Sequence, residues 1–408
     1  MMPTAPPAPS PPARMARASY APAAALAAFR VLLLAALPYE ALFGYGDYQH
    51  FFNLAQFARE GPGGLPLVGH WVEFPPIFPY LSLAIYRLTG GVPHLFSYAL
   101  ALLMTACDSV NVILLTRIAA KRFTGPDGGR AGWIYAGFLA LPAFGWWTFE
   151  PLAVLWMLLA LDAFLSGRAT RAGVAAGLGI LTKVIPGAVL PVAWRFLPRR
   201  QAAVATAAAA AVVAAGLAPF FIVRPEMAAA SLRSQASKGS WETIWALLDG
   251  NRGTGIFGPL RERLDPALAA LPRGEPARIP HWIPSLVAGA LGLLILLRTD
   301  GRDRRKSVVL LAFLLSLLFL WARGWSPQWL AYLAPLLLLS LPLGQALGFG
   351  LNLVAISLLE WPLLLSRGAF GMLWIPVVIR TVVLLLLALV LGRSLLETRL
   401  APDLGGRG

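Results

Sequence analysis

Of the chain's 408 residues, 58% are hydrophobic and only 13% are charged. The mean hydropathy is +0.68, and apolar runs of about 20 residues recur, as expected for helices that cross a bilayer. The formal net charge of +15 would suggest a nucleic-acid partner for a soluble protein, but no such binding motif is present. The one cysteine, Cys107, excludes an internal disulfide. The composition therefore predicts a polytopic all-α membrane protein without a nucleic-acid partner.

The N-terminal residues 1–20 are rich in Pro and Ala and show no apolar periodicity, which predicts a disordered cytoplasmic tail. The apolar run at about 20–43 has a basic front, as a signal peptide does. Arg30 interrupts this run, however, and no A-x-A cleavage site precedes Gly44. We therefore expect an uncleaved first helix.

Residues 44–93 follow as the first expected external loop. After Asp47, apolar residues recur at helical spacing over 48–60 and polar residues occupy the opposite stripe, so this segment predicts an amphipathic helix on the membrane surface. The apolar stripe consists of Tyr48, Phe51, Phe52, Ala55 and Ala58. Asp47 would be the N-cap, and capping alone is a sufficient explanation for an Asp there.

Orientation follows from four clusters of Lys and Arg that belong on the cytoplasmic side. They are Arg117, Lys121, Arg122 and Arg130; Arg168 and Arg171; Arg195, Arg199 and Arg200; and Arg302, Arg304, Arg305 and Lys306. A full span over 76–90 would put the first cluster outside. We therefore interpret that segment as interfacial or re-entrant and begin the second full span near His94.

The remaining apolar runs complete a bundle of about twelve transmembrane helices with both termini inside. They cover roughly 131–149, 150–167, a short pair at 171–184 and 185–197, then 201–223, 281–298, 307–322, 327–344, 346–366 and 371–393. One transmembrane domain, 21–398, thus includes a long external loop at 224–280. A cytoplasmic tail, 399–408, follows it.

Polar residues inside apolar runs are costly and need a partner or a function. Asp108 and Asn111 are three residues apart on one helix face, so we expect them to bond to neighbouring helices, for example at Arg30. Lys183 lies between two apolar halves, where a charged residue is functional by default. Glu150 begins a helix, where it either lines a site or interacts with the helix dipole.

Five sequence motifs together resemble one family. In chain order they are GDYQHF after the first span, EFPPI, CDSVN, LTKVIPGAVLP and SPQWLAYLAPL. They resemble the polyprenol-phosphate-sugar-dependent mannosyltransferases of the GT-C superfamily. Their order and spacing are similar to those of the endoplasmic-reticulum enzymes that add the first mannose to GPI anchors. The resemblance covers about residues 25–345 and implies a GT-C-type fold.

The resemblance implies a role for two acids. Asp47 matches the first-loop acid that serves as catalytic base, and Glu73 matches the acid of the family's E-Y-P-P-L segment, with Phe74 in place of Tyr. Many members carry a D-x-D pair in this loop, whereas Gln49 occupies the second position here. The sequence therefore does not support a divalent metal, and no metal ligands or other cofactor are expected.

The resemblance also implies cations and polar groups that bind substrate. Lys183 falls on the Lys of the T-K-x-x-P motif, and Gln328 falls on the S-x-Q-Y motif, with Trp329 in place of Tyr. Departure of a lipid phosphate requires cationic groups, and the candidates are Lys183, Arg233, Lys238 and Arg323. Ordinary alternatives are snorkelling for Arg323 and a solvated helix for Arg233 and Lys238. The other candidates for substrate binding are Tyr48, His70 and Glu150.

Together these features predict a hexosyltransferase, with mannose as the favoured sugar, that acts at the outer face of the cytoplasmic membrane. Its partners would be a polyprenyl-phosphate donor, a lipid or glycan acceptor and membrane lipids. Inverting transfer needs no enzyme nucleophile. A transporter of lipid-linked sugars or polysaccharides, and an O-antigen polymerase or ligase, are the alternatives. The first would show inverted halves, and the second would not place an acid directly after the first span.

Overall fold

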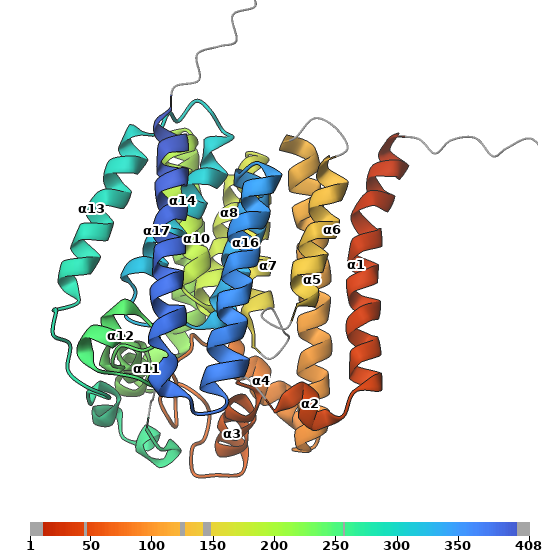
Figure 1. Ribbon diagram of the computed structural model, residues 1–408. Coiled ribbons are helices and arrows are strands. Elements are labelled where there is room, and N and C mark those ends of the chain that lie inside the picture. Colours follow the sequence, from red (N-terminus) through yellow and green to blue (C-terminus); the bar gives the residue numbers. More distant parts are fainter. Residues whose placement is uncertain (1–10, 45–46, 123–126, 142–147, 256–257, 398–408) are drawn as a thin grey trace, which may run out of the picture. The chain divides into compact units, whose positions relative to one another are not determined.

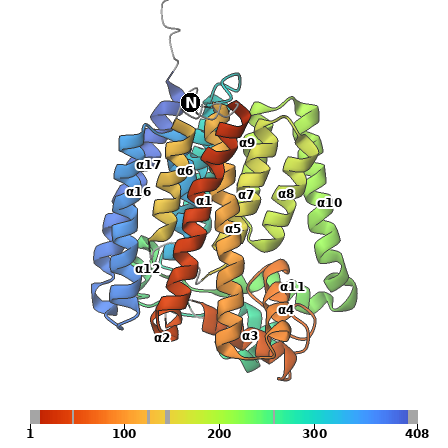
Figure 2. The ribbon, with the colours of Figure 1, turned by 90° about the vertical axis from the view of Figure 1, so that its right-hand side faces the viewer.

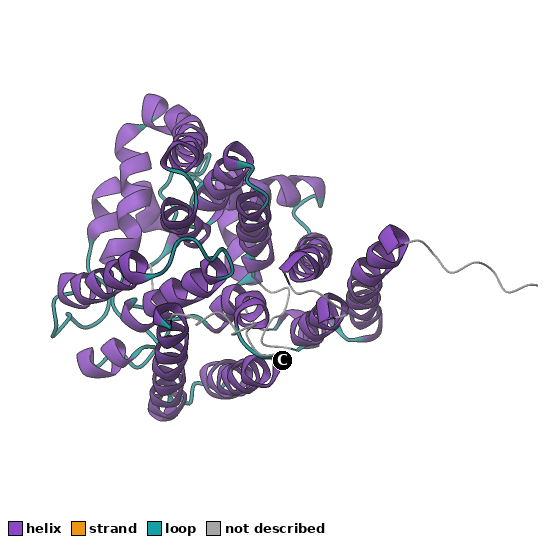
Figure 3. Ribbon diagram, turned by 90° about the horizontal axis from the view of Figure 1, so that it is seen from above, coloured by secondary structure: helices purple, strands orange, loops and turns teal. Residues whose placement is uncertain are grey.

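The computed structural model describes residues 11–44, 47–122, 127–141, 148–255 and 258–397. Helices and loops make up these ranges, and the extended segments contribute only isolated bridges rather than strands (Figure 3). The chain divides into two compact units. Unit 1 comprises 1–187, 208–235 and 259–270, and unit 2 comprises 188–207, 236–258 and 271–408.

Unit 1 is built from the N-terminal helices. They are α1 (Pro11–Ala36), α2 (Tyr39–Phe43), α3 (Tyr48–Arg59), α4 (Ile77–Leu88), α5 (Pro93–Arg122), α6 (Asp127–Ala140), α7 (Glu150–Leu165), α8 (Ala169–Thr182), the second half of α10 (Arg199–Val223) and most of α11 (Pro225–Ser237). Helices α1, α5 and α6 run side by side (Figure 1, Figure 2).

Helix α1 begins earlier than composition predicts. The sequence suggests an irregular tail through residue 20, whereas the structure is helical from Pro11 onward. A proline is tolerated in the first turn of a helix, and the Ala, Arg and Met residues that follow are good helix formers. Residues 1–10 of the expected N-terminal tail and the expected C-terminal tail, 399–408, lie outside the described residues.

A buried polar cluster joins α1, α5, α6 and α7. Arg30 Nη1 donates to Asp108 Oδ2 at 2.8 Å, and Arg30 Nη2 donates to the Leu139 carbonyl at 2.8 Å. Asn111 Nδ2 donates to Asp108 Oδ1 and to the Pro151 carbonyl. Arg30 and Asp108 are 1% and 2% exposed. The predicted interhelical role of Asp108 and Asn111 is confirmed.

Helix α3 has the predicted amphipathic form. Its buried residues include Tyr48, Phe51, Phe52 and Ala55, whereas Gln49 and Gln56 are exposed. The apolar face packs on α4 within an aromatic core that also contains Phe78 and Phe149. At 12 residues, α4 is shorter than the ~20 residues that a span needs, consistent with the interfacial or re-entrant interpretation.

Unit 2 contains the C-terminal helices. They are α9 (Val189–Phe196), the first turns of α10, α12 (Ile244–Asp249), α13 (Trp282–Arg298), α14 (Lys306–Trp321), α15 (Leu330–Ser340), α16 (Leu343–Leu358) with a π-helical continuation (Leu359–Leu365), and α17 (Trp374–Leu396). Helix α14 packs on α15, α17, α13 and α9. It is apolar around its circumference, as a central helix should be.

Four helical segments in the described residues are long and apolar enough to cross a membrane: Pro93–Lys121, Arg199–Val223, Leu343–Leu365 and Phe370–Leu396. Shorter apolar helices cover Tyr20–Ala36, Ile77–Leu88, Trp282–Arg298 and Lys306–Trp321. These segments support the membrane assignment of the chain. The total of about twelve spans and their sidedness stay predictions.

Candidate functional site

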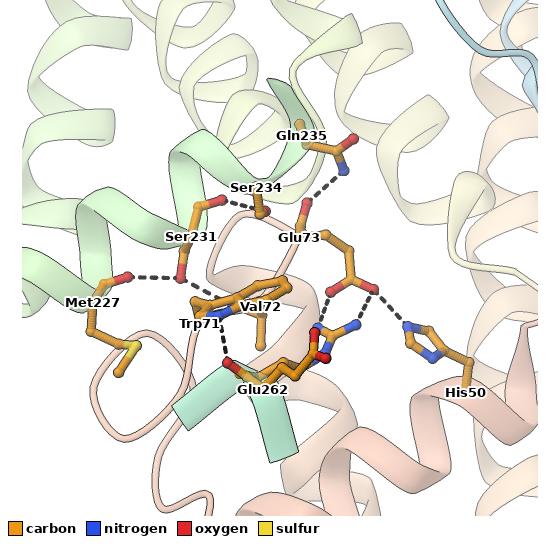
Figure 4. Close-up of polar contacts among 10 residues, drawn as sticks. His50, Trp71, Val72, Glu73, Met227, Ser231, Ser234, Gln235 and Glu262 are labelled. Atoms are coloured by element: carbon orange, nitrogen blue, oxygen red, sulfur yellow. Dashed lines mark hydrogen bonds and ion pairs between the residues drawn. The ribbon is translucent and has the colours of Figure 1, made fainter. Parts of the chain in front are cut away.

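The centre of the candidate site in unit 1 is Glu73, which is 3% exposed. Its Oε2 pairs with Arg263 Nη1, and its Oε1 accepts from Arg263 Nη2 at 3.1 Å. His50 Nε2 lies 2.6 Å from the same Oε1. Arg263 comes from the 3₁₀ turn Leu260–Leu264, and His50 comes from α3 (Figure 4). Three separate parts of the chain therefore meet at one carboxylate.

The backbone around Glu73 is held on both sides. On one side are two residues of α11, Ser231 and Gln235 (Figure 4). The Val72 amide donates to Ser231 Oγ at 3.1 Å, and Gln235 Nε2 donates to the Glu73 carbonyl at 2.8 Å. On the other side, the Trp71 amide donates to the Arg263 carbonyl at 3.0 Å. These bonds fix the position of the Glu73 carboxylate before any substrate binds.

Burial of Glu73 opposes its ionisation. The charges of Arg263 and then His50, with the hydrogen bonds from both, outweigh that effect and hold the Glu73 pKa well below its usual range. A base with so low a pKa accepts protons poorly at neutral pH. The environment of Glu73 therefore suits a group that positions Arg263 and His50 better than one that accepts a proton.

Asp47 and His50 lie at the start of α3, three residues apart and thus on one face of the helix. Asp47 occupies the N-cap position as predicted, yet its side chain makes no capping hydrogen bond. It is partly exposed, and the His50 side chain is 37% exposed. Both groups are therefore accessible, and His50 contacts the buried Glu73.

A second ion pair in unit 1 joins two of the predicted residues. Lys183 Nζ pairs with Glu150 Oε1, and their side chains are 19% and 2% exposed. Lys183 directly follows α8, which ends at Thr182 because Pro186 has no amide to donate to the carbonyl four residues earlier. Glu150 begins α7 as predicted. The end of α8 thus places the Lys183 ammonium group beside the first residue of α7.

An aromatic cluster connects the two ion pairs. Phe74 follows Glu73, and its ring centroid is 6.3 Å from the His50 ring and 5.2 Å from the Phe149 ring. Lys183 Nζ lies 5.2 Å from the centroid of the same Phe149 ring, within cation–π range. The structure therefore gathers three predicted residues, Glu73, Glu150 and Lys183, in one region of unit 1, and Asp47 lies one helical turn before His50.

Three other predicted residues of unit 1 lie differently. Tyr48 is 1% exposed and stacks on Phe43 with ring centroids 5.3 Å apart, so its ring belongs to the core. His70 is fully buried, and its Nδ1 bonds to the Gly63 carbonyl at 2.9 Å. Burial lowers the His70 pKa and so favours the neutral ring. Arg233 is exposed on α11 and bonds to the Ala229 carbonyl of its own helix.

The remaining predicted residues belong to unit 2. Lys238 Nζ lies 3.8 Å from the centroid of the Trp241 ring, and the Arg323 carbonyl accepts from the Trp241 amide at 3.1 Å. Arg323 Nη1 also donates to the Lys238 carbonyl at 3.5 Å. Gln328 lies in the short 3₁₀ helix Pro327–Trp329 and is partly buried. Lys238 and Arg323 are thus neighbours, whereas Lys183 and Arg233 are part of unit 1.

Two residues of the site were not singled out from the sequence. His50 lies within the GDYQHF motif, three residues after Asp47, and this helical spacing could have identified it. Arg263 is one of several basic residues in the 224–280 loop, and no sequence signal separates it from the others. Among the residues that the structure describes, no group of three or more His, Cys, Asp or Glu is placed to hold a metal ion.

No known protein-family model and no curated protein sequence matches this chain.

Proposed function

We propose that the chain is a GT-C-type membrane glycosyltransferase of about twelve spans. It transfers a hexose, with mannose the favoured sugar, from a polyprenyl-phosphate donor to a lipid or glycan acceptor at the outer face of the cytoplasmic membrane. The observation that carries this proposal is the gathering of the Glu73–Arg263 pair and the Glu150–Lys183 pair in one region of unit 1, with Asp47 one helical turn before His50, which contacts Glu73. An accessible acid near a partly exposed cation is what glycosyl transfer requires.

In the proposed reaction, Asp47 takes the proton from the acceptor hydroxyl as its oxygen attacks the anomeric carbon of the donor. The bond between that carbon and the phosphate oxygen breaks, and the polyprenyl phosphate leaves with the electron pair. Lys183 stabilises the developing phosphate charge. Displacement in one step inverts the anomeric centre and needs no covalent enzyme intermediate.

Glu73 has a positioning role in this mechanism. With Arg263 fixed on one side, its carboxylate holds His50, and His50 sets the rotation of α3 and with it the direction of Asp47. The burial of Glu73 and its low pKa support this assignment over a role as the base. Lys183 already has a carboxylate partner, so a donor phosphate would compete with Glu150 for it.

Transfer and transport give different outcomes in one experiment. The purified protein is reconstituted in liposomes that contain polyprenyl-phosphate-mannose with a radiolabelled sugar, and acceptor lipids extracted from host membranes are added. A glycosyltransferase moves the label from the polyprenyl carrier to a new lipid or glycan. If the label stays on its carrier and only becomes inaccessible to an added mannosidase, the chain is a transporter and the proposal is wrong.

A further inference from the structure

Unit 2 contains a pocket of about 380 Å³. None of the candidate site residues described above lines it. One wall is formed by Glu242, α12 and the loop after it, and the other by the turn Phe370–Met372 and the first turns of α17. Its volume is near the lower limit for small-molecule sites, so it has room for a headgroup but not for a long lipid chain.

Glu242 is the unusual residue of this pocket. It is 5% exposed, and its Oε2 has no hydrogen-bond partner among the described residues. Its φ of 52° is in the left-handed region, which a residue with a side chain seldom adopts. Arg380, itself paired with Glu360, donates to the Glu242 carbonyl and holds this conformation. A strained backbone that the surroundings maintain suggests a functional constraint.

The Glu242 carboxyl is suited to an uncharged ligand. Burial, followed by the negative charge of Glu360, raises the Glu242 pKa to about 8, although Thr254, Arg380 and Lys238 act in the opposite direction. The raised pKa favours the protonated group, which can both donate and accept a hydrogen bond. A hydroxyl group has the same dual capacity.

The other lining residues complete a site for an amphiphile. The side chains of Phe370 and Trp374 are 44% and 55% exposed and stand at the start of an apolar helix, where aromatic residues commonly mark the membrane interface. Arg252 is exposed and adds a guanidinium with five donors. The Asn251 amide is occupied by Ser240 and by the Glu275 backbone, so it shapes the loop.

From these contacts we propose that this pocket binds the neutral sugar headgroup of a membrane glycolipid. The hydroxyl groups of the sugar bond to Glu242 and Arg252, and its apolar face lies on Trp374 and Phe370, with the lipid chain outside the pocket. This proposal concerns unit 2 alone. It stands whether or not the chain transfers sugar.

The test uses the full-length protein in phosphatidylcholine nanodiscs and two soluble probes with the same chain, hexyl mannoside and hexyl phosphate. We expect saturable binding of the mannoside, weakened by roughly 10-fold in Trp374→Ala and Glu242→Ala, as loss of one good contact predicts. Glu242→Gln should retain binding because the amide also donates and accepts. Trp282→Ala is the matched control, since Trp282 is 67% exposed and does not line the pocket.

A hexyl mannoside with a photoreactive group on the sugar assigns the location directly. The cross-link should fall on peptides from 244–253 or 370–377. Labelling elsewhere only, unchanged affinity in Trp374→Ala, or tighter binding of hexyl phosphate than of the mannoside would each overturn the proposal. If Glu242→Ala does not fold, Trp374→Ala and the cross-link still decide the result.

Discussion

Glu73 and Arg263, separated by 190 positions in the chain, form a two-point ion pair in which each side chain is 1% exposed. The pair joins the first large loop to the 224–280 loop within unit 1. Because a buried charge that loses its partner is strongly destabilising, this contact should be essential to the local fold.

The first prediction tests that contribution. Arg263→Ala leaves the Glu73 carboxylate buried beside only His50, so we expect a loss of about 3–5 kcal/mol in the free energy of unfolding. Thermal or denaturant unfolding in detergent measures it. Arg261→Ala, which removes an exposed arginine of the same turn, should cost less than about 0.5 kcal/mol. Equal effects of the two variants would show that the ion pair is not important for stability.

The pH dependence of stability provides a second prediction. The Glu73 pKa is lower in the folded chain than the unfolded value of about 4.3, so the unfolded state binds more protons between the two values. The stabilisation that the ionised Glu73 contributes is therefore complete above about pH 4.3, and it disappears as the pH falls through the folded pKa of Glu73. Glu73→Gln should be less stable than the wild type at pH 7 and should lose less stability on acidification. A mutant curve parallel to that of the wild type would contradict this.

The Glu150–Lys183 pair allows structure and function to be separated. Lys183→Met alone leaves a buried acid unpaired and should destabilise the protein, whereas Lys183→Met with Glu150→Gln should recover most of that loss. If Lys183 also binds the donor phosphate, the double variant will fold but bind polyprenyl phosphate weakly. A double variant with wild-type donor affinity would reduce Lys183 to a structural role.

Some of these features follow from the sequence. Periodicity is local, so it correctly predicts helix α3, its buried face and the position of Asp47 at its start. The cost of polar groups in apolar helices likewise predicts that Asp108 bonds to a neighbouring helix, and its partner there is Arg30. The partner of Glu73 depends on how a distant loop folds back, and no periodicity encodes it. Tyr48 and His70 are candidates because they are close in sequence to a candidate acid, but both side chains are buried. Proximity in sequence does not determine whether a side chain is exposed.

Membrane sidedness is the fourth prediction, and cysteine labelling tests it. The loop glycines are poor labelling positions, because Gly64 and Gly274 have positive φ and a side chain at Gly301 would meet the Arg195 backbone. Leu65, Leu271 and Arg302 are exposed and suit cysteine substitution in a Cys107→Ser background. We expect an impermeant reagent applied to spheroplasts to label positions 65 and 271 but not 302, because the basic clusters belong inside. The reverse pattern would invert the proposed orientation.

The fifth prediction concerns Asp47. As a general base it must approach the acceptor hydroxyl to about 3 Å, and its loss should lower transfer by at least ~100-fold. Asn is nearly as good as Asp at an N-cap, so Asp47→Asn preserves any contribution to the start of α3 while removing the base. We therefore expect this variant to fold with wild-type stability, to bind the polyprenyl-phosphate donor and to transfer almost no sugar. Glu226→Gln, at an exposed acid of a surface ion pair, provides the control and should retain full activity.

Near-normal transfer by Asp47→Asn would leave Asp47 without a chemical role. Because Glu73 is held ionised with both oxygens occupied, the search for the base would then turn to His50, the partly exposed group in contact with it.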